Sequence, residues 1–229
     1  MQIGDIIQII VSLSKVRKLF WSEDDFKFAF ATQVQLKFGK AAEVRLEKRY
    51  KGEKDKNSYT DIVVRLNGKN FPIELKYKTV KGSYTDFGNE VVELMTHSAV
   101  DLGCYAYLKD INRLEYLAKN DPDFERGFAI ILTNEPLYYR DTGRSSVYDA
   151  FKIYDGKTVS GMLDWDRSNY DLEKLPYKAA GSLSILPGPA AILLMIVSIS
   201  AGVTMNGFFG KCLMLPVTRN ESSLLSATS

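Results

Sequence analysis

Two carboxylates and a lysine, Asp61, Glu74 and Lys76, lie in a part of the chain whose pattern predicts neighbouring β-strands. Carboxylate oxygens are ligands that Mg²⁺ prefers, usually one or two of them together with water and a substrate phosphate. A lysine beside such an ion can orient or help deprotonate an attacking water, and it can stabilise negative charge that develops on the phosphate. These residue types therefore favour metal-assisted hydrolysis of a phosphodiester bond.

The elements that must bring these residues together are two strands predicted at 59–66 and 71–77. Between them, Asn67-Gly68 is typical of a two-residue hairpin turn. Counting back from this turn along both strands places Asp61 opposite Glu74, with the Cβ atoms roughly 4.5–5.5 Å apart. Two carboxylates so placed repel each other unless a cation lies between them. Alternation along the strand puts the lysine on the same face as Glu74.

A plainer interpretation of Glu74-Leu75-Lys76 is a solvated strand face that carries an ordinary ion pair. The opposed Asp61, the hairpin turn and the apolar strands favour the metal site over that interpretation.

The remaining pattern predicts a layered fold. Ser22 can cap a helix that Gly39 ends. The predicted helices are 3–20, 23–38 and 97–119, and the further predicted strands are 44–50, 127–133 and one or two within 150–165. The polar segment 79–95 has no clear predicted structure, and 134–150 is predicted to be a loop. This order of elements predicts an α/β or α+β domain.

Tyr59-Thr60-Asp61, followed after twelve residues by Glu74-Leu75-Lys76, resembles the core motif of the PD-(D/E)XK nuclease superfamily. The resemblance spreads over residues 20–165. It includes the helix start at 22–26, Arg45-Leu46-Glu47 in the first strand, and 101–103 and 108–110 in the later helix. Thr60 stands where the family motif has proline. The resemblance implies a restriction-endonuclease-like central mixed sheet flanked by helices, divalent-metal nuclease chemistry and a nucleic-acid substrate. We expect this substrate to be DNA rather than RNA.

The resemblance also implies roles for individual residues. Asp61 and Glu74 would bind Mg²⁺, or Mn²⁺ in its place, and Lys76 would position the attacking water. An acidic residue in the first helix of such folds often joins the site, and Glu23 matches it best. An acid in the first turn of a helix also stabilises the helix dipole, so capping explains Glu23 nearly as well.

A nucleic-acid surface is predicted around the hairpin. Between Lys37 and Lys81 there are thirteen Lys or Arg and six Asp or Glu, and such a local surplus can follow a phosphate backbone. The candidate contacts are Lys48, Arg49, Lys78 and Tyr77, and the tyrosines at 50, 59 and 84 could stack on bases. The alternative is a basic face that serves only solubility.

Composition excludes several other classes. The net charge is +2, so the whole chain is not a polycation. Cys104 and Cys212 are far apart, which argues against a zinc site or a disulfide framework, and the single His97 weakens a Ser-His-Asp interpretation. We therefore expect a reduced, cytoplasmic protein without a signal peptide, which could form a homo-oligomer.

The last part of the chain differs from the rest. We expect a nuclease domain at 1–178 and a distinct tail at 179–229, in which 179–210 carry no charge. The segment 189–210 is long enough to span a membrane. The tail could instead complete the core or an oligomer interface, or it could be the product of a frameshift. Two alternative functions follow: a nucleic-acid-binding module that does not cut, and a membrane-tethered interaction protein.

Overall fold

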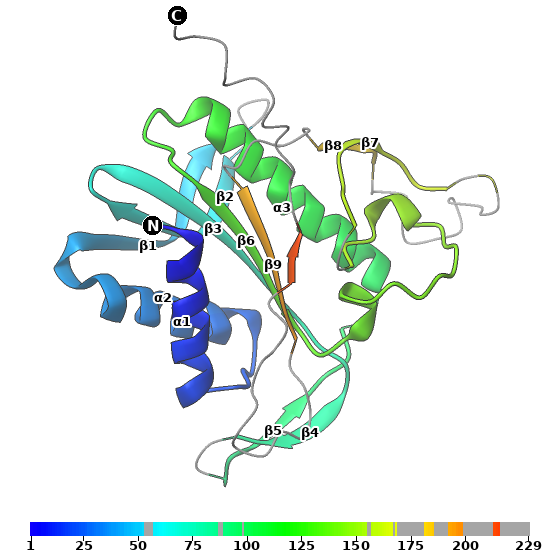
Figure 1. Cartoon of the computed structure of the whole chain (residues 1–229), viewed down its shortest axis with the longest axis horizontal. Coiled ribbons are helices and arrows are strands. Elements are labelled where there is room, and N and C mark those ends of the chain that lie inside the picture. Colours follow the sequence, from blue (N-terminus) through cyan, green and yellow to red (C-terminus); the bar gives the residue numbers. More distant parts are fainter. Residues whose placement is uncertain are drawn as a thin grey trace, which may run out of the picture.

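A computed structural model describes much of the chain (Figure 1). It covers residues 1–52, 57–86, 89–97, 99–154, 157–166, 168 and 181–185, and the backbone of 192–198 and 213–215. Within this part the fold is mixed α/β, with three α-helices, a central mixed sheet and small hairpins.

Four neighbouring strands of the central sheet are ones that the sequence predicts. In order across the sheet, β1 (Ala42–Lys51), β2 (Asn57–Leu66) and β3 (Lys69–Lys78) pair antiparallel, and β6 (Gly127–Thr133) pairs parallel with β3. Beyond β6, the backbone of β9 (Ile192–Ser198) runs parallel to it, and β10 (Leu213–Leu215) pairs with β9.

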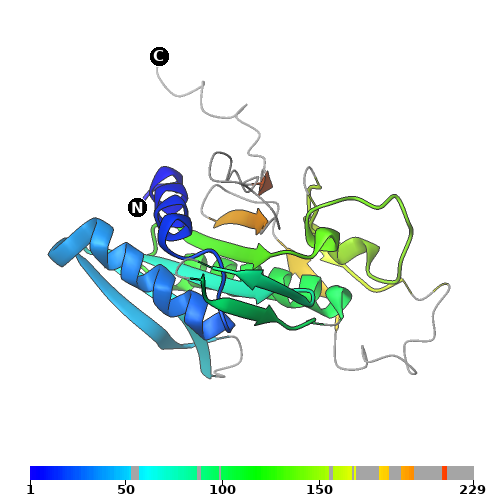
Figure 2. The ribbon, with the colours of Figure 1, turned by 90° about the horizontal axis from the view of Figure 1, so that it is seen from below.

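The three helices cover both faces of this sheet (Figure 2). Helices α1 (Ile3–Val16) and α2 (Glu23–Phe38) pack on one face, and α3 (Val100–Asn120) packs on the other. The strand β6 shows the alternation between faces. Phe128 and Ile130 belong to the core beneath α1 and α2, whereas Ala129 and Ile131 belong to the core beneath α3. A strand that is buried on both faces reads as a continuous apolar run.

The predicted ends of α2 are confirmed. The hydroxyl of Ser22 accepts a hydrogen bond from the backbone N–H of Asp25, and Gly39 ends the helix with a φ of 57°. That backbone region favours glycine, because a side chain there is strained.

The predicted hairpin is also confirmed. Asn67 and Gly68 have φ angles of 51° and 76°, as a two-residue turn between twisted strands requires. Leu66 pairs with Lys69, and the ladder continues in this register to Ile62 opposite Ile73. Asp61 and Glu74 are therefore the next positions along the two strands.

Two small hairpins lie outside the central sheet. One pairs β4 (Gly82–Thr85) with β5 (Val91–Leu94), and the other pairs β7 (Gly161–Leu163) with β8 (Leu183–Ile185). The first falls in segment 79–95, which has no clear predicted structure because its strands are too short for alternation to stand out. The predicted loop at 134–150 also holds short 3₁₀ turns at Pro136–Tyr138 and Asp149–Phe151.

No helix in the described part of the chain is long and apolar enough to cross a membrane. Of the predicted span at 189–210, only 192–198 is described, as the backbone of β9. The rest of that span lies outside the described residues. The three interpretations of the tail, as a membrane span, as part of the core or an interface, and as a frameshift product, therefore stay predictions.

Candidate active site at the end of the β2–β3 hairpin

The site forms where β2 and β3 stop pairing. N–H groups two residues apart on a strand point to the same side, so the loss of β2 as a neighbour leaves the N–H groups of Leu75 and Tyr77 without ladder partners on that side. Two carboxylates supply the acceptors. Asp61 Oδ2 accepts from the Leu75 N–H at 2.8 Å, and Glu23 Oε2 accepts from the Tyr77 N–H at 2.9 Å. The backbone itself therefore anchors two of the predicted site residues.

Asp61 lies close to a buried lysine of α2. Lys27 Nζ is 3.1 Å from Asp61 Oδ1 and 3.2 Å from an Asp24 oxygen, and it also pairs with Glu47. The lysine is 7% exposed. Burial opposes its charge, but the three carboxylates outweigh burial and raise its pKa. Lys27 is thus a permanent cation beside Asp61.

Glu74 is buried on the α3 side of the sheet, with 1% exposure. Arg113 of α3 approaches it with both ends of its guanidinium, Nη2 at 2.9 Å from Oε2 and Nε at 3.4 Å from Oε1. Burial nevertheless raises the pKa of Glu74 to about 8, and the carboxylate of Asp110 acts in the same direction against Arg113. Glu74 is therefore protonated more readily than an exposed glutamate.

Lys76 projects from β3 between two acids. Its Nζ is 2.9 Å from Asp110 Oδ2 and 3.6 Å from Glu23 Oε1. Burial disfavours the charged lysine, but these carboxylates outweigh burial and raise its pKa to about 12. Lys76 is therefore an ammonium at neutral pH, suited to donate hydrogen bonds and to stabilise negative charge.

The structure brings together the four residues that the sequence predicts as the site. Glu23 forms an ion pair with Lys76, and Asp61 accepts from the backbone of β3. Glu74 is connected to Lys76 through Arg113 and Asp110. Ser22 caps α2, and the carboxylate of Glu23 accepts a hydrogen bond from the backbone of β3 instead.

The predicted nucleic-acid contacts fare differently. Lys48 and Arg49 are exposed on β1, and Lys78 is half-buried on β3. The prediction that Tyr77 contacts nucleic acid is wrong, because its side chain is 3% exposed and its ring packs against Phe20 and Phe26. Phe71, Ile73, Leu75 and Tyr77 of β3 all face the core beneath α1 and α2.

Comparison of the chain with protein-family models, with curated proteins and with solved structures finds no match.

The balance of charge in the site favours a cation. Among the described residues, these ion pairs join six carboxyl side chains to only three cationic ones. The acids are Glu23, Asp24, Glu47, Asp61, Glu74 and Asp110, and the cations are Lys27, Lys76 and Arg113. Burial and the neighbouring carboxylates raise the pKa of Glu74 and of Asp110, so the excess of acids disfavours their charged forms. A divalent cation would offset this excess.

No cluster of three or more acidic, histidine or cysteine side chains in the described part of the chain is placed to hold a metal on its own. Two carboxylates suffice for Mg²⁺ when water and substrate phosphate complete its shell. Asp61 and Glu74 supply hard oxygen donors of that kind.

Lys27, Asp110 and Arg113 were not predicted as site residues. For Lys27 and Asp110 the sequence does contain an indication, because a charged residue within the apolar stripe of a helix is unusual. Lys27 lies next to Phe26 in the buried stripe of α2, and Asp110 lies next to Ile111 in that of α3.

Proposed function

We propose that the chain is a metal-dependent nuclease that hydrolyses phosphodiester bonds in DNA. The observation that carries the proposal is the position of Asp61 and Glu74, which end a paired hairpin on adjacent strands with the ammonium of Lys76 beside them. The proposal predicts that Mg²⁺, or Mn²⁺, is required for cleavage.

The arrangement of the sheet supports the proposal. An antiparallel hairpin continues into the parallel pair β3–β6, and helices cover both faces. A central mixed sheet flanked by helices is what the resemblance to the PD-(D/E)XK nucleases implies, and the motif that carries this resemblance lies in β2 and β3.

Asp61 and Glu74 would hold the Mg²⁺ ion. When bound, such an ion lowers the pKa of a coordinated water and offsets charge on the phosphate. Asp61 is already oriented by the Leu75 N–H. The guanidinium of Arg113 holds the carboxylate of Glu74 in place. The same guanidinium would compete with a metal ion for the charge of that carboxylate.

Lys76 and Glu23 have roles other than metal binding. Lys76 stays protonated between Asp110 and Glu23, so it can hold a water by hydrogen bonding and stabilise negative charge on the transferred phosphate. Glu23 fixes the end of α2 to β3 through the Tyr77 N–H. It thereby positions Lys76 relative to the two carboxylates.

A second candidate is a DNA-binding module that does not cut. The observation that favours it is that each proposed ligand already has a cationic partner, Lys27 for Asp61 and Arg113 for Glu74. Such a module would bind DNA equally well with and without Mg²⁺.

Cleavage by the full chain separates the two candidates. Linear, circular and single-stranded DNA, and RNA of matched sequence, are incubated with Mg²⁺ or with EDTA. The nuclease proposal expects Mg²⁺-dependent cleavage of DNA, reduced at least about 100-fold in Lys76→Ala. Lys69→Ala, an exposed lysine at the other end of β3, is the matched control and should cut normally. Absence of Mg²⁺-dependent cleavage, or full activity of Lys76→Ala, overturns the proposal.

A further inference from the structure

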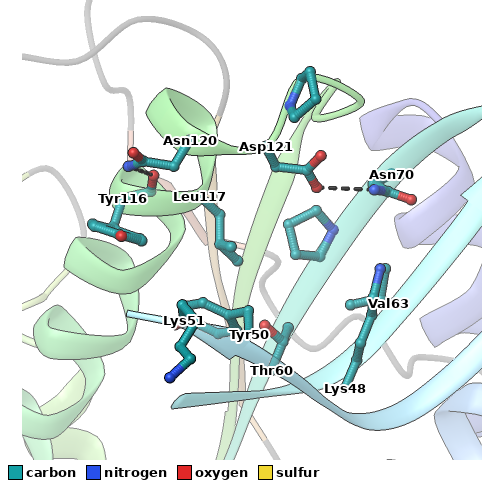
Figure 3. A pocket seen from close by; sticks show the side chains of 12 residues that line it. Lys48, Tyr50, Lys51, Thr60, Val63, Asn70, Tyr116, Leu117, Asn120 and Asp121 are labelled. Carbon is teal, nitrogen blue, oxygen red and sulfur yellow. Dashed lines mark hydrogen bonds between the residues drawn. The ribbon is translucent and has the colours of Figure 1, made fainter. Parts of the chain in front are cut away.

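A pocket of about 360 Å³ lies between the C-terminal half of α3 and the strands β1, β2 and β3 (Figure 3). Tyr116 and Leu117 line it from the helix, and Tyr50, Thr60 and Val63 line it from the strands. Its volume falls within the range of roughly 300–1,000 Å³ that is common for sites of small ligands. We call it the Tyr50–Tyr116 pocket.

A break in β1 creates one wall of this pocket. Glu47 has a φ of 48°, and the ladder between β1 and β2 is interrupted at this residue. Before the break, Leu46 packs against the core beneath α1 and α2. After it, Lys48 and Tyr50 line the pocket on the α3 side. Alternation alone would keep all three on one face, so the break turns a basic and an aromatic side chain toward the pocket.

The lining has the chemistry of a nucleobase site. The rings of Tyr50 and Tyr116 are stacked, with centroids 6.4 Å apart and planes inclined by 29°. Thr60 is 0% exposed, and its Oγ1 has no hydrogen-bond partner in the described part of the chain. Figure 3 shows this hydroxyl pointing toward the ring of Tyr50. Flat aromatic faces stack on bases, and a buried polar oxygen without a partner favours a ligand that supplies one.

A second buried oxygen and two lysines complete the lining. Asn70 is 5% exposed, and its amide donates to Asp121 at 2.9 Å. Its Oδ1 has no hydrogen-bond partner among the residues that the structure describes. Lys48 and Lys51 are exposed at the rim. In Figure 3 the Asn70 oxygen points away from the pocket, so Thr60 supplies the polar atom for the edge of a base and the two lysines supply cations for its phosphate.

The pocket adjoins the candidate active site. Thr60 directly precedes Asp61, and Tyr116 follows Arg113 by about one turn of α3. Burial raises the pKa of Tyr50 to about 12, and the charges of Arg113 and Glu74 also act on it. A base in this pocket would therefore lie one nucleotide or so from a phosphate held at the carboxylates.

Resting on the proposed function, we propose that the Tyr50–Tyr116 pocket binds the base of an unpaired nucleotide beside the phosphodiester bond that is cut. The pocket is walled by α3 on one side and by the strands on the other, so it can admit a single base but not a stacked base pair. The substrate is then single-stranded DNA, or DNA with an unpaired segment at the cleavage position.

Binding without Mg²⁺ tests this inference apart from cleavage. The full chain in EDTA is titrated into a single-stranded oligonucleotide that carries one 2-aminopurine, into the same sequence as a duplex, and into free 2-aminopurine nucleotide. We expect fluorescence quenching with the single strand. Tyr116→Ala should weaken single-strand binding roughly 10-fold or more and remove the quenching. It should leave duplex binding unchanged.

Two further variants separate stacking from structure. Tyr116→Phe keeps the ring and should bind as the unaltered chain does. Phe28→Ala removes an aromatic ring that is 62% exposed on α2, outside the pocket, and should also bind normally. Thermal unfolding checks that Tyr116→Ala is folded at the temperature of the assay. If it is not, Tyr116→Leu, which fills similar space without an aromatic face, takes its place with the same expected loss.

Several results would overturn the inference. These are unquenched binding of the single strand, equal losses for single strand and duplex in Tyr116→Ala, or free nucleotide binding as tightly as the oligonucleotide. None of them touches the nuclease proposal, which depends on Mg²⁺-dependent cleavage. Conversely, a chain that does not cut but shows the expected quenching keeps the pocket and loses the nuclease.

Discussion

The carboxylate of Asp61 accepts a hydrogen bond from the backbone N–H of Leu75 at 2.8 Å, just beyond the last pair of the β2–β3 ladder. A side chain thus takes the place of a missing strand partner. The same carboxylate faces Lys27 with its other oxygen. One residue therefore has both a structural and a proposed metal-binding role, and suitable substitutions can separate them.

Asp61→Asn and Asp61→Ala should differ in stability but not in activity. Asparagine keeps an oxygen for the Leu75 N–H, whereas alanine leaves that buried donor unpaired, which costs about 1–3 kcal/mol. Both remove a charged ligand and should abolish Mg²⁺-dependent cleavage. Urea unfolding and a cleavage assay check this. Equal stability of the two variants would contradict the structural role of the carboxylate.

The pH dependence of metal binding follows from Glu74. Its pKa in the folded chain, about 8, lies above the ordinary value of 4.5. The protonated form is therefore favoured by folding, and its stabilising contribution is complete below about pH 4.5 and is lost as the pH rises to about 8. Mg²⁺ binds the carboxylate, so the increase in melting temperature that Mg²⁺ causes should be larger at pH 8.5 than at pH 6.5.

The control for this pH effect is Glu74→Gln, which has no proton to release. Its melting temperature should show little response to Mg²⁺ at either pH. A response to Mg²⁺ in the unaltered chain that is the same at pH 6.5 and pH 8.5 would show that Glu74 is not the titrating ligand.

Arg113→Gln should make folding depend on Mg²⁺. The substitution removes the cation that pairs with Glu74 and Asp110, and breaking a buried pair of this kind costs about 3 kcal/mol or more. A bound Mg²⁺ ion would restore the lost charge balance. Chemical unfolding in EDTA and in Mg²⁺ should therefore show a large loss of stability in EDTA and a smaller one in Mg²⁺.

The matched control is Arg126→Gln, which removes an arginine that contacts Gln2 away from the site. Its stability should not respond to Mg²⁺ more than that of the unaltered chain. An equal loss of stability for Arg113→Gln in EDTA and in Mg²⁺ would contradict the binding of Mg²⁺ beside Glu74.

The parts of this fold that local chemistry dictates could be predicted from the sequence. Asn67-Gly68 determines the hairpin turn, and with it the register in which Asp61 and Glu74 are the next positions beyond the ladder. Ser22 and Gly39 determine the ends of α2 in the same way. These signals are short-range, so one sequence contains them in full.

Long-range pairing was not predictable in this way. Arg113 reaches Glu74 from a helix that lies 39 residues further along the chain, and no periodicity shows which polar residue of α3 will meet the sheet. The break at Glu47 depends on a backbone angle that non-glycine residues seldom adopt. Its effect on Lys48 and Tyr50 could not be foreseen from alternation.

The most direct measurement is the binding of Mn²⁺ to the full chain at pH 8.5, detected by electron paramagnetic resonance. The account predicts a Mn²⁺ site that Mg²⁺ displaces and that is lost in both Asp61→Asn and Glu74→Gln. The site should be kept in Asp123→Asn, which removes a carboxylate that pairs with Arg65 instead. Mn²⁺ binding that is unchanged in Asp61→Asn and Glu74→Gln, or absent from the unaltered chain, would contradict the assignment of these two carboxylates as a metal site.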